Sequence, residues 1–138
     1  MRPFYFVTFN TSGRRPLLAR PEVHEAFIGF CERARGKDIA VGRYVLMPDH
    51  AHLFVALPQD GISLPQWVRA LRTMMGKRLL ELGSDKPHWQ EGFFDHVLRS
   101  TESYGQKWDY VRMNPVRAGL CAEPESWPYQ GEIERIAF

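Results

Sequence analysis

The stretch Tyr44-Val-Leu-Met-Pro-Asp-His-Ala-His-Leu-Phe-Val-Ala-Leu57 decides the fold of this chain. Its apolar and β-branched residues predict two strands, over residues 39–47 and 50–57, and the Pro48-Asp49 pair between them is typical of a tight turn. The two strands are therefore expected to form an antiparallel hairpin. Because side chains alternate along a strand, His50 and His52 point to the same side of the second strand.

The rest of the chain is predicted to form a strand and a helix before the hairpin, and a helix, a strand and a further helix after it. We predict strands over residues 4–9 and 93–98, and helices over residues 21–35, 64–82 and 101–113. Gly36 suits the end of the first helix, and Pro115 biases Asn114 away from helical backbone. The order of elements predicts an α+β fold, an antiparallel sheet of the split βαβ (ferredoxin/RRM-like) type, with helices on one face and an added tyrosine-bearing helix.

Length and composition set broad limits on function. The chain has 138 residues, which suits a single domain spanning residues 1–138. Its formal net charge of +2 favours an anionic partner only weakly. Cys31 and Cys121 are isolated, so a reducing cytoplasm fits better than a disulfide framework. The longest apolar runs are strand-sized, so we expect a soluble, cytoplasmic protein with no membrane partner.

Four side chains form the main chemical candidate. Two neutral imidazoles on one face of a strand, His50 and His52, can hold a divalent metal. Tyr110 and Asn114 lie four residues apart on the predicted helix and share a face of it. Together they offer a phenol nucleophile and a donor set of two imidazoles and an amide oxygen, which suits Mg²⁺ or Mn²⁺ and also permits Zn²⁺. Asn114 can instead cap the helix end, and Asp49 is either a turn residue or an acceptor that orients an imidazole.

Three ordered segments carry a resemblance to a known family. They are Met47-Pro-Asp-His-Ala-His-Leu-Phe-Val55, Trp89-Gln-Glu-Gly-Phe-Phe-Asp-His-Val-Leu-Arg99 and Tyr110-Val-Arg-Met-Asn-Pro-Val-Arg-Ala-Gly-Leu120. From the strand at Tyr5 to Trp127-Pro128, the chain resembles the REP-associated tyrosine transposases. These are domesticated relatives of single-tyrosine insertion-sequence transposases within the HUH endonuclease superfamily.

The resemblance implies a metal-dependent single-stranded DNA endonuclease and strand transferase that acts through a 5′-phosphotyrosine intermediate. It makes Tyr110 the nucleophile, His50 and His52 the metal pair, and Asn114 the polar group that completes the metal site. The expected cofactor is Mg²⁺ or Mn²⁺, and the expected partner is single-stranded DNA near a hairpin of repetitive extragenic palindromes. The chain would act as a monomer or a homodimer, with the site in one chain or shared across two.

Cationic side chains are the candidate DNA contacts. The helix over residues 64–82 carries Arg69, Arg72 and Lys77, and Arg112 and Arg117 lie close to Tyr110 in the sequence. Such charges are usually solvated helix surface. Beside a site that cleaves DNA they become candidate phosphate contacts.

The rival interpretation is a non-catalytic single-stranded nucleic-acid-binding module on the same fold, which would use basic and aromatic residues. Trp89, Phe93 and Trp108 are candidates for base stacking, although core packing is the more common role of each. Asp95-His96 is a second polar pair whose role, structural or catalytic, stays open. Tyr104, on the same helix as Tyr110, is the second candidate nucleophile.

Overall fold

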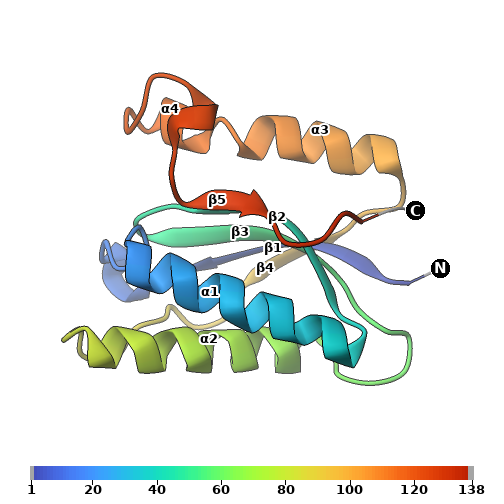
Figure 1. The fold of residues 1–138 in the computed structure, drawn as a ribbon, viewed down its shortest axis with the longest axis horizontal. Coiled ribbons are helices and arrows are strands. Elements are labelled where there is room, and N and C mark those ends of the chain that lie inside the picture. Colours follow the sequence, from blue (N-terminus) through green and yellow to red (C-terminus); the bar gives the residue numbers. More distant parts are fainter. Residues whose placement is uncertain (1, 137–138) are drawn as a thin grey trace.

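The computed structural model describes residues 2–136 and confirms the α+β prediction. Figure 1 shows a sheet that lies between two helical layers. The helices are α1 (Pro21–Ala34), α2 (Leu64–Glu81), α3 (Thr101–Val111) and α4 (Asn114–Arg117), with short 3-10 turns η1 (Ser12–Arg14), η2 (Arg35–Lys37) and η3 (Pro124–Ser126). The strands are β1 (Phe4–Asn10), β2 (Ala40–Leu46), β3 (His50–Ala56), β4 (Phe94–Val97) and β5 (Gln130–Glu132).

The sheet has the order β4-β1-β3-β2-β5, and every neighbouring pair is antiparallel. The predicted hairpin is present: β2 and β3 are joined through Pro48-Asp49, and the Met47 amide donates to the His50 carbonyl at 2.8 Å. β3 is the central strand, which pairs with β1 on one side and β2 on the other. The histidine-bearing strand is therefore held on both edges.

Alternation along β3 divides the core between two faces. Leu53 and Val55 point to the face that α1 and α2 cover, where they pack with Phe27 and Trp67. Phe54 points to the opposite face and packs against Tyr104 of α3. Burial of an aromatic ring such as Phe54 contributes about 1.5–3 kcal/mol. His50 and His52 have the same parity as Phe54, so they also face the layer of α3 and α4.

A glycine allows α3 to approach the sheet closely. The register between β2 and β3 shifts between Val41 and Tyr44, at Gly42. A Cβ atom at Gly42 would lie only 2.6 Å from the Tyr104 hydroxyl oxygen, which itself accepts a hydrogen bond from the Arg43 amide at 3.0 Å. A side chain at this position would therefore push α3 away from the sheet.

Two local predictions differ from the structure, and one strand was not predicted. Helix α1 runs into η2, and its left-handed terminal residue is Asp38 (φ 58°) instead of Gly36. Asn114 does have helical backbone, because it begins the new helix α4. Pro115 lies in the first turn of α4, where a backbone amide would have no acceptor within the helix, so the missing amide hydrogen costs nothing. Strand β5 was not predicted, because three polar and glycine residues at a sheet edge carry no hydrophobic alternation.

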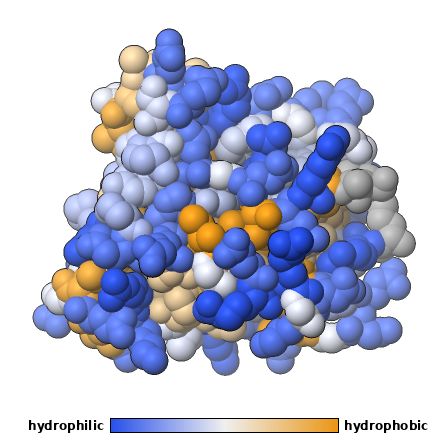
Figure 2. Space-filling model, viewed as in Figure 1, coloured by the Kyte–Doolittle hydropathy of each residue, from blue (hydrophilic) through white to orange (hydrophobic). Residues whose placement is uncertain are grey.

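The outer surface agrees with this layering. Figure 2 shows mostly hydrophilic residues in the view of Figure 1, with hydrophobic residues in small separate patches. Within residues 2–136, the helices are too short or too polar to cross a lipid bilayer.

Candidate active site and nucleic-acid interface

A hollow of about 360 Å³ lies between the sheet and the α3–α4 layer. It brings together four of the predicted site residues, because β3 presents its even-numbered side chains to this layer. The lining residues are Phe6, Thr8, Asn10, Arg14, His50, His52, Lys107, Tyr110, Val111 and Asn114. The metal pair, the phenol and the amide expected from the sequence therefore share one cavity.

The two histidines are neighbours, as strand alternation predicts. Their ring centroids are 4.7 Å apart, and the ring planes are nearly perpendicular, at 83°. His50 lies opposite Asn10 and His52 lies opposite Thr8 in the pairing of β1 with β3. Both partners on β1 also line the hollow.

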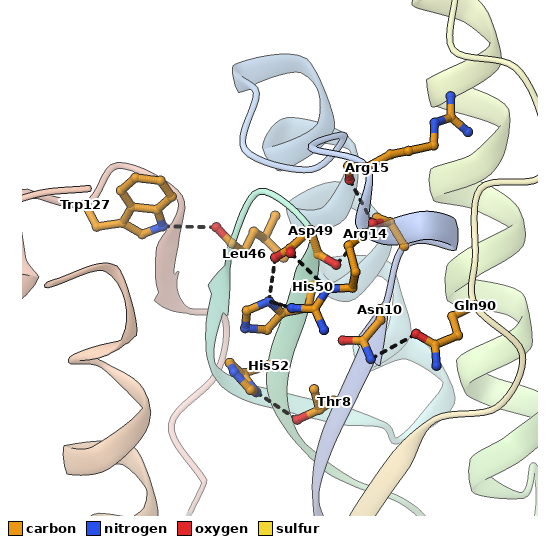
Figure 3. A network of polar contacts seen from close by, with 11 residues as sticks. Thr8, Asn10, Arg14, Arg15, Leu46, Asp49, His50, His52, Gln90 and Trp127 are labelled. Carbon is orange, nitrogen blue, oxygen red and sulfur yellow. Dashed lines mark hydrogen bonds and ion pairs between the residues drawn. The ribbon is translucent and has the colours of Figure 1, made fainter. Parts of the chain in front are cut away.

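His50 is held by a chain of charged groups (Figure 3). Its Nδ1 lies 2.8 Å from Asp49 Oδ1, and the Arg14 Nε donates to Asp49 Oδ2 at 2.9 Å. Burial alone would raise the pKa of Asp49, but the hydrogen bonds from Arg14 and His50 outweigh it and lower that pKa. Because an ionised carboxylate only accepts hydrogen bonds, His50 donates from Nδ1 to Asp49, and Nε2 is the ring nitrogen that faces no acidic partner and could bind a cation.

His52 is kept neutral by its surroundings. Its Nδ1 lies 2.7 Å from the Thr8 hydroxyl, and its ring stacks on Phe6 with centroids 5.5 Å apart. Burial, followed by the positive charges of His50 and Arg117, lowers the pKa of His52 to about 3. With Nδ1 held against the Thr8 hydroxyl, Nε2 is the ring nitrogen of His52 that could act as a metal ligand.

Tyr110 is the exposed aromatic residue of this hollow. Its side chain is 65% exposed. The Arg117 guanidinium lies 4.1 Å from the Tyr110 ring centroid, and the Arg117 Nη2 donates to the Tyr110 carbonyl at 2.8 Å. Tyr104, the other tyrosine of α3, is buried with its hydroxyl bonded to the Arg43 amide. Only Tyr110 of these two presents its phenol to solvent.

Asn114 lines the hollow from α4, so the break between α3 and α4 does not separate it from Tyr110. Within residues 2–136, no three His, Cys, Asp or Glu side chains are grouped as a metal site. The hollow therefore offers two imidazoles, the amides of Asn114 and Asn10, and the Thr8 hydroxyl as possible donors.

The predicted DNA contacts do not form one surface. Arg69, Arg72 and Lys77 line a different hollow, between α2 and residues 86–92, on the far side of the sheet from α3. Arg112 does not line the histidine hollow and is paired with Glu125 at 3.2 Å. Of the five cations, Arg117 alone lies against the tyrosine.

Sequence reasoning missed the cations that do reach the histidine hollow, Arg14 and Lys107. Arg14 lies in the turn η1, and its role depends on a contact with Asp49 that spans 35 residues. Lys107 sits over the Phe6 ring, with its Nζ 5.1 Å from the centroid. No local pattern signals either contact.

The remaining candidates have mainly structural contacts. Trp89 packs against Phe9 and donates its Nε1 hydrogen to the Arg72 carbonyl at 3.0 Å. Trp108 packs on Phe54 and lies under Arg43. Phe93 packs against the buried core on the α1–α2 side. Asp95 and His96 are exposed on β4 and do not line the histidine hollow.

Comparisons with known proteins agree with the resemblance seen in the sequence. The chain is 25% identical over 125 residues to the REP-associated tyrosine transposase of Escherichia coli (strain K12), covering 91% of this chain and 73% of the relative. A protein of Haemophilus influenzae, provisionally given the same name, is 25% identical over 118 residues, which cover 78% of this chain and 65% of the relative.

Solved structures give the same result. The fold matches a REP-associated tyrosine transposase bound to a REP hairpin with a TM-score of 0.71 and 25% identity, over 94% of this chain and 77% of that one. No protein-family model matches the sequence. The similarity to transposases thus extends over nearly all of the chain, in sequence and in fold.

Proposed function

We propose that this chain is a divalent-metal-dependent endonuclease and strand transferase for single-stranded DNA, acting through a 5′-phosphotyrosine at hairpin-associated repetitive sequences. The observation that carries the proposal is the shared hollow, in which the exposed phenol of Tyr110 accompanies His50 and His52. The similarity to transposases, one of them bound to a REP hairpin, supports the choice of DNA as substrate.

The donor groups fit Mg²⁺ or Mn²⁺. His50 and His52 would bind through Nε2, since the Nδ1 atoms face Asp49 and Thr8. Asn114 would contribute its amide oxygen from α4. When bound, such a cation polarises the phosphoryl oxygens and spreads the charge that develops during attack.

Arg14 and Asp49 act as positioning residues for His50. The Asp49 carboxylate fixes the ring orientation and the tautomer, and Arg14 keeps that carboxylate ionised. Thr8 plays the corresponding role for His52.

The reaction is a transesterification. The Tyr110 hydroxyl oxygen attacks the phosphorus, the bond from phosphorus to the 3′ oxygen breaks, and a phosphodiester joins the 5′ end to the tyrosine. The proton lost by the phenol is balanced by the proton gained by the departing 3′-hydroxyl. A second 3′-hydroxyl reverses the step and joins strands without ATP, because the phosphotyrosine keeps the bond energy. Lys107 and Arg117 supply positive charge beside the phosphate.

We further propose that one chain forms a complete site, because the tyrosine and the histidines of the same chain line one hollow. A homodimer would then not need to exchange Tyr110 between subunits.

The test uses hairpin-bearing, fluorescently labelled single strands with Mn²⁺, followed by a denaturing gel. Wild-type protein should form an adduct that survives SDS. Tyr110→Phe should form none, with unchanged fold and DNA affinity, because the ring volume is kept. The matched variant Tyr104→Phe should keep the adduct while losing about 1 kcal/mol of stability, because the Arg43 amide loses its acceptor. An adduct with Tyr110→Phe would overturn the assignment of the nucleophile.

A non-catalytic binding module is the second candidate, favoured by the cationic hollow beside α2, which lies away from the histidines. Reversible DNA binding with no adduct in any metal would favour it.

A further inference from the structure

A hollow of about 800 Å³ lies between α2 and residues 86–92. Its lining combines apolar surface from Leu80, Pro87 and Trp89 with the cations Arg69, Lys77 and Lys86. Within residues 2–136, none of these three cations is engaged in an ion pair, and Glu91 is the only acidic residue of the lining.

The outer wall of this hollow is held in place before any ligand arrives. The Arg72 guanidinium donates to the carbonyls of Gln90 and Gly92 at 3.3 and 2.8 Å. Arg15 anchors the same segment from the β1 side by donating to the carbonyls of Asp85 and Pro87 at 3.0 and 2.9 Å. A preformed wall lowers the ordering cost of binding.

Charge and apolarity together select the ligand class. Unpaired cations neutralise phosphates, whereas apolar and aromatic walls cover the faces of bases. Paired DNA hides its base faces in the stack, so an unpaired strand is the form that uses both features.

The two hollows meet at one hydrogen bond. Asn10, which lines the histidine hollow, donates from Nδ2 to the Gln90 Oε1 at 3.3 Å, and Gln90 lines the α2 hollow (Figure 3). A strand cleaved beside Tyr110 can therefore continue over the Asn10–Gln90 pair to the far side of β1.

We propose that the α2 hollow binds the unpaired DNA segment that adjoins the cleaved phosphodiester, with Lys77 and Lys86 on its phosphates and bases against Trp89. This inference rests on the proposed function for the identity of the strand. It separates the protein into a site that cleaves and a site that holds the single-stranded flank.

The first experiment measures binding in the Tyr110→Phe background, so that no cleavage interferes. The probes are a blunt DNA hairpin and the same hairpin with an oligothymidylate extension of about 12 nucleotides, on either end. Lys77→Glu with Lys86→Glu should weaken binding of an extended probe several-fold and reduce the salt slope by about 0.7 for each lost phosphate contact. Affinity for the blunt hairpin should not change.

The matched control makes the same charge change elsewhere, with Arg33→Glu and Lys37→Glu at the end of α1 and in η2. Equal losses in the control, or equal losses for the blunt hairpin, would overturn the proposal. Tighter binding of an oligouridylate than of the oligothymidylate would overturn the assignment to DNA.

The second experiment places 5-iododeoxyuridine in the extension and maps the photo-crosslink by mass spectrometry. A crosslink at Trp89 supports the proposal, and one confined to Trp108 contradicts it. Cleavage is scored separately through the SDS-resistant adduct of wild-type protein. If the Trp89 crosslink forms but the adduct does not, the proposed cleavage is wrong and the role of the α2 hollow stands. If the adduct forms but the crosslink does not, the role of the α2 hollow is wrong and the proposed cleavage stands.

Discussion

The Arg14 Nε donates a hydrogen bond to the Asp49 carboxylate at 2.9 Å. The backbone of Arg14 meanwhile adopts a conformation that is unfavourable for any residue with a side chain. Arg14 has φ 56°, in the left-handed region, and follows Gly13 at φ 63°. Such a conformation costs a non-glycine residue about 1–2 kcal/mol. A strained residue whose side chain reaches a candidate site points to a role in function, not in stability.

Replacing Arg14 with glycine should separate these two contributions. Arg14→Gly relieves the backbone strain, which stabilises the fold. It also removes an exposed ion pair and increases the conformational entropy of the unfolded chain, both of which destabilise the fold. The free energy of unfolding should therefore change by less than about 1 kcal/mol. Mn²⁺ affinity, measured by calorimetry, should fall by about 10–100-fold, because Asp49 is no longer held against His50.

Asp38→Gly is the control for Arg14→Gly. Asp38 is also left-handed, at φ 58°, but lies at the end of η2, away from the hollow. It should leave Mn²⁺ affinity unchanged. Equal Mn²⁺ affinity in wild type and Arg14→Gly would remove Arg14 from the site.

The half-buried imidazole of His52 should make the metal-free protein sensitive to acid. Its pKa falls from the ordinary value near 6.5 to about 3 in the fold. Between those pH values the unfolded chain binds more protons at His52 than the folded chain does. The free energy of unfolding is therefore unaffected by this histidine above pH 6.5 and decreases as the pH falls toward 3. Urea midpoints measured with a chelator should fall more steeply with acid in wild type than in His52→Gln. His96→Gln, on exposed β4, should keep the wild-type slope.

Arg69 and Arg72 should respond differently to truncation, although they lie three residues apart. Arg72→Ala removes hydrogen bonds to Gln90 and Gly92 and should cost about 1–2 kcal/mol of stability. Arg69→Ala should change stability by less than about 0.5 kcal/mol and reduce the salt slope of DNA binding by about 0.7. Urea denaturation and binding across salt concentrations measure both, and equal stability losses would contradict the structural role of Arg72.

The contact of Arg117 with Tyr110 should affect the rate of cleavage. Arg117→Ala removes a cation over the ring and a hydrogen bond to the Tyr110 carbonyl, worth together about 1–2 kcal/mol. The single-turnover rate of adduct formation at saturating DNA should fall about tenfold. Arg112→Ala, which breaks only the pairs with Glu125 and Asp109, should keep the wild-type rate. If both variants reduced the rate, the cause would be a less stable helix α3, and the contact of Arg117 with Tyr110 would have no specific role in positioning the tyrosine.

Local patterns were sufficient for the hairpin and for the direction of its histidines. Alternation and the Pro48-Asp49 turn are encoded within a few residues, and the structure follows them. The placement of α2 against the opposite face from α3 depends on how distant segments pack. The sequence therefore makes Arg69, Arg72 and Lys77 candidate DNA contacts of the cleavage site, whereas in the structure they line a hollow on the other side of the sheet from Tyr110.

The central position of β3 should make the strand that carries the histidines open less often than helix α3, which carries Tyr110. Hydrogen bonds to both β1 and β2 secure the histidine strand, so its amide hydrogens exchange only when the sheet opens. Helix α3 packs on the outer face of the sheet through Tyr104, Trp108 and Val111. We expect its amides to exchange through local undocking while β3 stays protected. Under the proposed function, undocking of α3 would move Tyr110 and the strand attached to it away from histidines that stay fixed in the sheet.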